Sequence, residues 1–559
     1  QLYFQSPYTD YDKANGIEKA SAELCGFAKT DILAPGASET VNITVDKSEL
    51  RTYDANNAKT YIVDAGDYYF AAATDAHNAV NNILAAKGYT VENTDGRMTA
   101  DGDVALTYKW TNAALDSTTF ATSENGTAIT NLFDEADPNK SSSEPGEVTW
   151  LSRSNWVATF PTQPVVLNAT QTLADHLAFT RYDGSKADSV EMPTLGADNG
   201  LALVSMIGAD YDDPQWDTLL DQLTFNEMVN TITLGFHNTA AVESIGKTRT
   251  KDENGPQGLT AALTGGASAM CYTSEDVMAA TFNVDLINDV GRCIGEDCLA
   301  MGYSGLYGPG INMHRTAYSG RNFEYYASDP FVAGTICAAE VNGIQSKGVY
   351  VYLKHVALND SESSRRGVNT WLNEQAAREI YLEVADKAIT DGGAWSVMTG
   401  FNRWGAYWCG AYDNLLTGFL RGELGMRGMI ITDYSGSSKY MDLADGLIAG
   451  SDIWDSPDPT IHTTLAPKYE NDAYIVTEMR ESMHKILYTV ANSNAMNGWS
   501  SADRLKVITP WWKTALYALD TVLAVLTVLC IWRLVVAIKR KKTWTAEQAA
   551  NTASAQNQQ

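Results

Sequence analysis

Apolar and polar positions alternate along the first part of the chain. Val41, Ile43 and Val45 are apolar while the residues between them are polar, and a further short apolar run lies at 61–63. Because successive side chains of a strand point to opposite faces, this period of two predicts half-buried strands. Glycine- and proline-containing turns separate the runs. We therefore expect a small all-β sandwich over residues 1–88.

The next stretch shows neither a strand period nor a helix period. Residues 89–205 are rich in Asp, Asn, Ser and Thr. We interpret them as a polar, partly extended connecting segment.

A helical period begins after Trp216. Thr224 and Glu227 have the spacing of a capping box, in which a hydroxyl and a carboxylate satisfy free backbone N–H groups at the start of a helix. The apolar residues Met228 and Ile232 follow at helical spacing. This pattern predicts a helix that starts just after Thr224.

Short apolar runs then alternate with helical stretches over roughly 280 residues. The runs lie at 305–307, 349–353, 394–398 and 429–431. Alternating β and α segments of this kind are typical of a parallel (β/α)8-type barrel, whose chemistry lies at the carboxyl ends of its strands. We place this barrel at residues 206–495.

A long apolar stretch lies near the end of the chain. Residues 515–538 are interrupted only by Asp520 and Arg533, and the basic run KRKK follows directly. We predict a single transmembrane helix with its stop-transfer cluster at 511–542, because 24 helical residues are long enough to span a bilayer and basic clusters stay cytoplasmic. The remaining tail, 543–559, is polar and low in complexity and is expected to be disordered and cytoplasmic. A buried amphipathic helix is the alternative interpretation.

The N-terminal sequence contains no signal peptide, which an exported protein requires. We therefore expect further sequence upstream of Gln1. The opening QLYFQS resembles the scar of a protease tag, but it also fits a native edge strand, which is the interpretation we favour.

Composition narrows the functional classes. The chain has 559 residues, with 40 Lys and Arg against 68 Asp and Glu, a formal net charge of −28. An acidic chain lacks the basic face that nucleic acids need, so a nucleic-acid partner is not expected. Seven scattered cysteines without paired spacing predict neither a zinc site nor a disulfide framework, and no nucleotide-binding motif is present, so no metal and no cofactor are expected.

Hydrogen-bonding side chains follow the predicted barrel strands. The segments concerned are GPGINMHR, GRNFE, the Lys354-His355 pair, MTGFN and TDY. Because each sugar hydroxyl both donates and accepts, a pocket with Arg, Lys, His and Asp side chains fits a small polyhydroxylated ligand.

These segments together resemble glycoside hydrolase family 3, the β-glucosidase and β-xylosidase family. The resemblance is carried by KHVALNDSESSRRGVNTWLNEQAAREIYL, GGAWSVMTGFNRWGAYWCG, LLTGFLRGELGMRGMIITDYSG, GLYGPGINMHR and GRNFEYYASDP. The first 88 residues look like the fibronectin type III-like module of this family. The module precedes the barrel here, which resembles the permuted branch, in which an α/β sandwich domain comes first. That domain is expected upstream of Gln1.

The resemblance implies roles for individual residues. Asp433 matches the nucleophile of a retaining glycosidase, which forms a glycosyl-aspartate intermediate. Arg321, Lys354, His355 and Arg365 match ligands for the hydroxyls of the bound sugar. We also expect Lys354 to keep Asp433 ionised, because a nearby cation lowers the pKa of a carboxyl group.

Other matched positions differ from the usual family pattern. Met398 and Phe401 match residues that pack against the sugar, although many members have Tyr at the second position. Tyr434 follows the nucleophile and is expected to stack on a sugar face. Asn254 matches a substrate-binding Asp, and Thr260 stands where many members have Arg, so the sugar bound need not be glucose.

The family takes its general acid/base from the α/β sandwich domain, so no residue of this chain inherits that role. Glu324 and Glu362 match supporting positions. The leading hypothesis is a membrane-anchored, extracellular exo-acting retaining β-glucosidase, acting on an oligosaccharide or aryl β-glycoside without a cofactor. A β-xylosidase or mixed-specificity enzyme is one alternative, and a non-catalytic carbohydrate-binding surface protein is the other.

Overall fold

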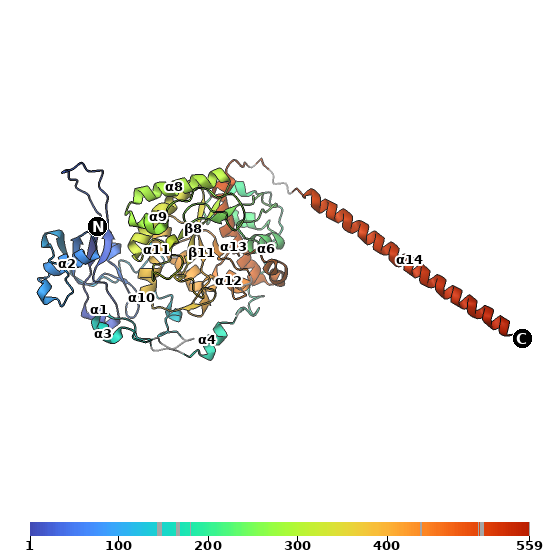
Figure 1. Cartoon of the computed structure of the whole chain (residues 1–559), viewed down its shortest axis with the longest axis horizontal. Helices are drawn as coiled ribbons and strands as arrows, with labels where there is room; N and C mark the ends of the chain where they lie inside the picture. The colour runs from blue at the N-terminus through green and yellow to red at the C-terminus, as the bar shows by residue number, and fades with distance from the viewer. Residues whose placement is uncertain are drawn as a thin grey trace. The chain divides into compact units, whose positions relative to one another are not determined.

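The computed structural model describes residues 1–141, 148–163, 168–178, 180–436, 439–500, 502–503 and 508–557. The chain divides into two compact units, Gln1–Asp503 and Arg504–Gln559. Figure 1 shows the first unit as a β-rich N-terminal part followed by a ring of helices around a central sheet.

The N-terminal part contains a four-stranded antiparallel sheet in the order β2-β1-β5-β6. A second, two-stranded sheet pairs β3 with β4. The strands are β1 (Leu2–Gln5), β2 (Glu23–Gly26), β3 (Thr52–Asp54), β4 (Thr60–Ile62), β5 (Gly66–Ala72) and β6 (Thr107–Asn112). The opening QLYFQS therefore does form a strand, as predicted, but the expected edge position is wrong, because β1 pairs with β2 on one side and with β5 on the other.

Two expectations for this part are wrong. The alternating segment around Val41 forms no strand, and Val41 itself is 39% exposed, although the partly buried Val45 packs against the small hydrophobic cluster around Phe4 and Tyr68. Conversely, β6 lies within the predicted connecting segment 89–205 and pairs with β5 along its whole length. The sheet therefore extends beyond residue 88.

The connecting segment also packs on the barrel. Phe133 is fully buried, and its ring stacks on Trp404 with centroids 4.2 Å apart. Its backbone N–H donates to Glu374. Part of this polar stretch is therefore barrel surface rather than a free linker, while residues 142–147, 164–167 and 179 lie outside the described part.

Five parallel strands form the barrel sheet in the order β7-β8-β9-β11-β14. They are β7 (Asp252–Asn254), β8 (Gly305–Gly310), β9 (Tyr350–Val356), β11 (Ser396–Thr399) and β14 (Ile430–Thr432). Backbone contacts continue past both edges: Ile431 bridges to Ile453, Trp454 N–H donates to Ile232, and Asp252 N–H donates to His237.

An eightfold barrel was predicted, and the described residues show five regular strands of it. Where the other barrel strands were expected, the described residues form single β-bridges or turns.

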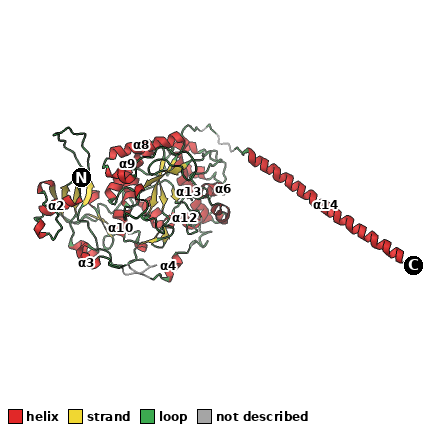
Figure 2. Ribbon diagram, in the orientation of Figure 1, coloured by secondary structure: helices red, strands yellow, loops and turns green. Residues whose placement is uncertain are grey.

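Helices surround this sheet, with strands inside and helices outside (Figure 2). The helices next to the barrel are α6 (Phe225–Thr233), α8 (Val284–Met301), α9 (Pro330–Gln345), α11 (Glu383–Thr390), α12 (Leu443–Ala449) and α13 (Ala473–Ala491). The α6 helix begins with the predicted capping box, in which Thr224 and Glu227 exchange hydrogen bonds.

The first unit also contains further helices and strands. They are α1 (Asp10–Asn15), α2 (Ala76–Ala86), α3 (Trp156–Thr159), α4 (Gln171–His176), α5 (Gln215–Leu220), α7 (Glu275–Ala280), α10 (Glu374–Ala376), β10 (Asn369–Thr370), β12 (Arg403–Trp404) and β13 (Tyr407–Trp408).

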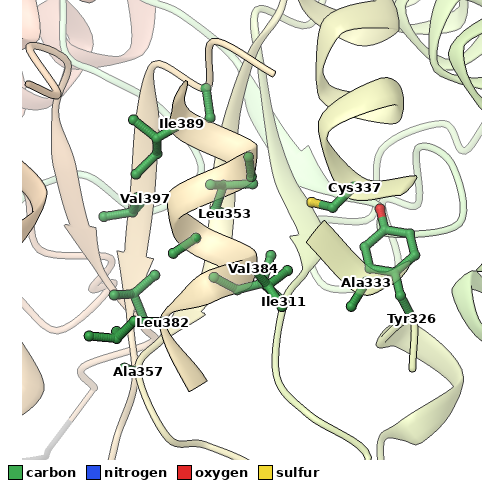
Figure 3. Close-up of a cluster of buried hydrophobic side chains, with 14 of the residues drawn as sticks. Ile311, Tyr326, Ala333, Cys337, Leu353, Ala357, Leu382, Val384, Ile389 and Val397 are labelled. Carbon is green, nitrogen blue, oxygen red and sulfur yellow. The ribbon is translucent and has the colours of Figure 1, made fainter. Parts of the chain in front are cut away.

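The barrel core lies between the sheet and its helices. Figure 3 shows Val384 and Ile389 of α11 beside Val397 of β11 and Leu353 of β9, while Cys337 lies on the neighbouring helix α9. Every residue of β9 is buried, as expected for a parallel strand covered on both faces. This packing fixes the strand ends that carry the polar residues.

The second unit is dominated by one helix, α14 (Trp511–Gln556). It is the one helix in the described part of the chain that is long and apolar enough to cross a membrane. It continues through residues 543–556, where we expected disorder, because the Ala-, Gln- and Glu-containing tail consists mostly of good helix formers. Residues 558–559 lie outside the described part.

Candidate active site

Asp433 lies directly after β14, at the carboxyl end of the sheet. Its side chain is buried, and its backbone N–H donates to the Thr399 carbonyl oxygen at 3.2 Å. Oδ1 accepts a hydrogen bond from the Tyr434 N–H at 2.7 Å, whereas Oδ2 is buried and has no hydrogen-bond partner among the described residues. One oxygen is thus held in place and the other is left free to react.

Two nitrogen-bearing side chains face that free oxygen. His355 Nε2 lies 3.4 Å from Asp433 Oδ2, and Arg365 Nη1 lies 3.8 Å from it. Burial, followed by the cations Arg321, Lys354 and Arg365, lowers the pKa of His355 well below its ordinary value. The histidine is therefore neutral, so its short distance to Asp433 is no ion pair, and Arg365 is the cation that faces the carboxylate.

The tautomer of His355 follows from its other neighbours. Arg321 Nη1, which can only donate, lies 3.2 Å from Nε2. Nε2 must then accept, which places the proton on Nδ1, 3.4 Å from the Tyr325 hydroxyl oxygen. Nε2, the His355 nitrogen that lies near Asp433, is therefore an acceptor, and Arg321 already donates to it.

Lys354 is paired with a different carboxylate from the one we expected. Its Nζ lies 3.2 Å from Glu324 Oε2, while Arg321 Nε donates to Glu324 Oε1 at 2.6 Å. Although burial acts to raise the pKa of Glu324, Lys354 and Arg321 outweigh it and lower that pKa to about 2. Glu324 is therefore a fully ionised support for the two cations.

Lys354 acts to lower the pKa of Asp433, as predicted, but the expectation that the pKa of Asp433 is lowered overall is wrong. Burial raises this pKa, and the opposing influences of Arg365, the Tyr434 N–H, Arg321 and Lys354 do not fully cancel it. Desolvation disfavours the charged form of any buried carboxyl group, and the nearest cations here are shared with other acids.

Arg365 is held by an acid and an aromatic ring. Its Nε lies 3.1 Å from Glu362 Oε2, and its guanidinium lies over the Phe401 ring at 4.6 Å. Phe401 and Met398 are both buried. Phe401 therefore contacts the cation that faces Asp433. Met398 lies in β11, the strand that pairs with β14.

The last two predicted residues lie on other parts of the rim. Tyr434 is 36% exposed, and its ring packs edge-on against Phe236 with centroids 6.0 Å apart. Asn254 ends β7, where its Nδ2 donates to Glu253 Oε1 at 3.3 Å. The described contacts of Asn254 thus lead to Glu253 rather than to Asp433.

Sequence reasoning missed a buried network beside this site. Glu253 Oε1 lies 3.0 Å from His237 Nδ1. The backbone N–H of His237 donates to the Tyr307 hydroxyl oxygen, and that hydroxyl donates to Asp455 Oδ1 at 3.4 Å. Burial raises the pKa of Asp455 to about 7, and repulsion from Asp433 adds to the shift. Asp455 follows a buried apolar run, as Asp433 does, and that signal was available in the sequence.

The site contains an unpartnered carboxylate oxygen on Asp433 and a cation, Arg365, that faces it. Two further cations, Arg321 and Lys354, lie in the same site. Glu324 and Glu362, the two glutamates of the site, are tied to Arg321 and Arg365. Within the described residues, no group of three or more His, Cys, Asp or Glu side chains has the geometry of a metal site.

Two protein families match parts of this chain. Residues 239–461 match the glycosyl hydrolase family 3 N-terminal domain, and residues 1–76 match the fibronectin type III-like domain. The predicted resemblance to glycoside hydrolase family 3 is thereby confirmed, and so is the order in which the fibronectin-like module precedes the barrel.

Individual curated relatives narrow the resemblance from the family to β-glucosidases. A β-glucosidase of Ruminococcus albus is 27% identical over 441 residues, which are 78% of this chain and 41% of the relative. β-Glucosidase A of Butyrivibrio fibrisolvens is 27% identical over 472 residues, or 81% of this chain and 51% of the relative. The chain thus spans about half or less of the length of these relatives.

The fold also has a solved counterpart. The crystal structure of a β-glucosidase from Paenibacillus barengoltzii superposes with a TM-score of 0.65 over 91% of this chain and 52% of that chain, at 20% identity. At this identity the likeness shows a shared fold. Together, the comparisons relate the chain to the glycoside hydrolases of family 3 and, within them, to β-glucosidases.

Proposed function

We propose that this chain is the sugar-binding and nucleophile-bearing part of a retaining exo-β-glycosidase, most closely a β-glucosidase. The observation that carries the proposal is the buried, unpartnered Oδ2 of Asp433, with Arg365 Nη1 3.8 Å away. In a retaining mechanism such an oxygen attacks the anomeric carbon as the bond to the leaving oxygen breaks. Water then hydrolyses the glycosyl-aspartate ester and restores the free carboxylate.

The surrounding residues have positioning and binding roles in this proposal. Arg321, Lys354 and Arg365 donate hydrogen bonds to sugar hydroxyls, and His355 lines the same wall. Arg365 also stabilises the Asp433 carboxylate when it leaves the sugar as the ester is hydrolysed. Because Glu324 holds Arg321 and Lys354 with charge-assisted hydrogen bonds, these donors are pre-organised before substrate arrives.

The remaining pocket residues shape the space around the sugar. Met398 and Phe401 form an apolar wall, and the partly exposed ring of Tyr434 stacks on a sugar face at the rim. Asn254 offers its carbonyl oxygen to an outer hydroxyl, because its amide nitrogen is already used by Glu253.

The proton for the leaving group comes from outside this chain in our proposal. The expected source is an α/β sandwich domain upstream of Gln1, as the family resemblance implies. A consequence follows for the chain by itself: it cleaves only substrates whose leaving groups need no proton, such as dinitrophenyl glycosides.

We further propose that α14 anchors the protein as a single-pass membrane helix. Its apolar segment is followed by Lys539, Arg540, Lys541 and Lys542, and basic residues favour the cytoplasmic side. The catalytic part then lies outside the cell and the C-terminus inside.

A β-xylosidase or mixed specificity is the second candidate. Three departures from the family pattern favour it: Asn254 has no carboxylate, Thr260 has no guanidinium, and Phe401 has no hydroxyl. Each change removes one polar contact from the pocket, which weakens discrimination by hydroxyl groups. A non-catalytic sugar-binding protein is the outcome if no turnover is found.

The test compares Asp433→Asn with wild type on dinitrophenyl β-glucoside and dinitrophenyl β-xyloside. We expect at least a thousandfold loss of kcat with the better substrate, because the amide cannot form the ester. Asp413→Asn, on an exposed residue whose side chain caps no helix, is the matched control and keeps wild-type rates. Unchanged hydrolysis by Asp433→Asn contradicts the proposal.

A further inference from the structure

His314, from the GPGINMHR segment, is a polar side chain that the proposed reaction does not use. It follows β8 and precedes a short 3₁₀ turn, Asn322–Glu324, to which Arg321 is the N-terminal cap. The side chain of His314 is half-buried. Its hydrogen bonds lead to the backbone of this turn, which we call the 321–324 turn, and of the residue that follows it.

The His314 ring holds the 321–324 turn at two points. Nε2 lies 2.9 Å from the carbonyl oxygen of Asn322 and 2.7 Å from that of Tyr325. Because carbonyl oxygens only accept, Nε2 must carry a proton and donate to both in a bifurcated hydrogen bond. The backbone N–H of His314 also donates to the Ala327 carbonyl oxygen at 3.1 Å. One residue thus binds three backbone carbonyl groups of the same segment.

A second side chain holds the middle of the turn. Gln257, in the loop after β7, donates from Nε2 to the Phe323 carbonyl oxygen at 3.0 Å. The same amide nitrogen donates to Glu275 of α7, and the Gln257 carbonyl oxygen accepts from the Tyr272 N–H at 2.8 Å. Side chains from two neighbouring strand loops therefore fix successive carbonyl groups of one short turn.

The 321–324 turn positions the cations of the proposed sugar pocket. Glu324 accepts from Arg321 Nε at 2.6 Å and lies 3.2 Å from Lys354 Nζ. Arg321 Nη1 lies 3.2 Å from His355 Nε2. Since Arg321 and Glu324 are only three residues apart, the backbone of the turn sets the position of both charges. A shift of this backbone would displace the guanidinium relative to the rest of the pocket.

His314 is attached to a fixed base, whereas the outer side of the turn is open. Met313, the preceding residue, is 3% exposed, and its N–H donates to the buried side chain of Asp360 at 2.7 Å. On the outer side, Phe323 is 53% exposed, and Tyr318 in the same loop is 92% exposed. Hydrogen bonds to fixed side chains therefore hold the turn where core packing covers it on one side only.

We propose that His314 is a positioning residue for sugar binding, which holds the 321–324 turn so that Arg321 presents its guanidinium to the pocket. His314 does not touch the sugar and acts through Arg321. A donor that is fixed before the ligand arrives loses less freedom on binding, which raises the affinity. The inference rests on the proposed sugar pocket but not on turnover.

The test measures glucose affinity by titration calorimetry, with the full chain in a detergent without a sugar headgroup. His314→Asn ends near the position of Nδ1 and is too short to reach both carbonyl oxygens, whereas His314→Gln places its amide nitrogen near the position of Nε2. We expect His314→Asn to weaken glucose binding about tenfold, because it releases the turn. His314→Gln should retain most of the affinity, and His314→Leu, which has no donor, should match His314→Asn.

A double-mutant comparison separates positioning from a general loosening of the protein. In an Arg321→Gln background, His314→Asn should weaken glucose binding by less than about twofold, because the cation that His314 positions is gone. His77→Asn, on an exposed residue of α2, is the matched control and should leave the affinity unchanged. An equal loss of affinity in both backgrounds overturns the inference, as does unchanged affinity in His314→Asn and His314→Leu.

Failure of this inference can be told from failure of the proposed function. Unchanged glucose affinity in His314→Asn, together with hydrolysis of dinitrophenyl glucoside by the wild-type chain, contradicts only the role of His314. Glucose binding that depends on His314, without any hydrolysis by the wild type, contradicts only the catalytic proposal. A wild-type chain that neither binds glucose nor hydrolyses the glucoside contradicts both.

Discussion

Lys354 Nζ lies 3.2 Å from Oε2 of Glu324, so the buried lysine is paired with Glu324 and not with Asp433. Arg321 holds the other oxygen of the same carboxylate. Glu324 thus fixes two of the proposed sugar-binding cations, which leaves Arg365 as the cation with the strongest influence on Asp433.

Glu324→Gln should destabilise the protein at pH 7 by about 3 kcal/mol, because it leaves Lys354 and Arg321 buried without their carboxylate. The folded-state pKa of Glu324 is about 2, which lies below its unfolded value. Its contribution to the free energy of unfolding is therefore complete above a pH of about 4.5 and is lost as the pH falls towards 2. Denaturant unfolding at pH 7 and pH 3 measures this. Glu362→Gln, on a more exposed partner of Arg365, is the control and should cost about 1 kcal/mol or less.

Arg365→Gln should move the acid limb of kcat/KM to higher pH. Burial already raises the pKa of Asp433, and Arg365 is the strongest opposing influence, so its loss raises that pKa further. Activity that needs the carboxylate then declines at a higher pH as the solution is acidified. Arg366→Gln is the matched control, since Arg366 lies over the same Phe401 ring at 5.2 Å but makes no described contact with Asp433. An acid limb that stays in place in Arg365→Gln contradicts this assignment.

Asn254→Asp should not restore tighter glucoside binding, although it recreates the usual family residue. Glu253 Oε1 accepts from both the backbone N–H of Asn254, at 3.0 Å, and its side-chain amide. A second carboxylate there meets like charge and loses a hydrogen bond, so KM should rise severalfold. The double variant Glu253→Gln with Asn254→Asp relieves the repulsion and should bring KM back to the wild-type value or below it. A fall in KM with Asn254→Asp alone disproves this explanation.

Glu423→Gln should destabilise the chain by about 3–5 kcal/mol. Arg378 is buried between Glu374 and Glu423, with Nη1 2.7 Å from Glu423 Oε2, and its guanidinium lies over the Tyr53 ring at 4.6 Å. Removing one acid leaves the buried cation undercompensated where the barrel meets the fibronectin-like part. Thermal unfolding compared with the exposed Glu470→Gln, which should match wild type, measures the effect.

The sequence predicted those features that follow from local pattern. The apolar runs ending near Lys354 and Asp433 became β9 and β14, and the Thr224 capping box opens α6. Alternation alone misled at Val41, because a period of two does not show whether the segment pairs with a neighbouring strand. The tail after residue 542 was predicted to be disordered but is helical, since its polar composition also suits an exposed helix.

The sequence did not predict which residues far apart in the chain form contacts with one another. Motif order placed Arg321, Lys354 and Asp433 at one end of the barrel, but only the coordinates show that Glu324 takes the lysine. The same holds for the link from His237 through Tyr307 to Asp455, whose members lie more than 200 residues apart at the extremes. Such contacts depend on how the strands close around the core, which no local spacing encodes.

The account rests on Asp433 as the residue that bonds to the sugar, and covalent trapping tests this most directly. The full chain is incubated with dinitrophenyl 2-deoxy-2-fluoro-β-glucoside, whose good leaving group requires no proton and whose fluorine slows hydrolysis of the ester, and the labelled peptide is then sequenced by mass spectrometry. We predict one fluoroglucosyl group per chain, on Asp433. A label on another carboxylate such as Asp455, or hydrolysis of dinitrophenyl glucoside that the reagent never inactivates, would contradict the account.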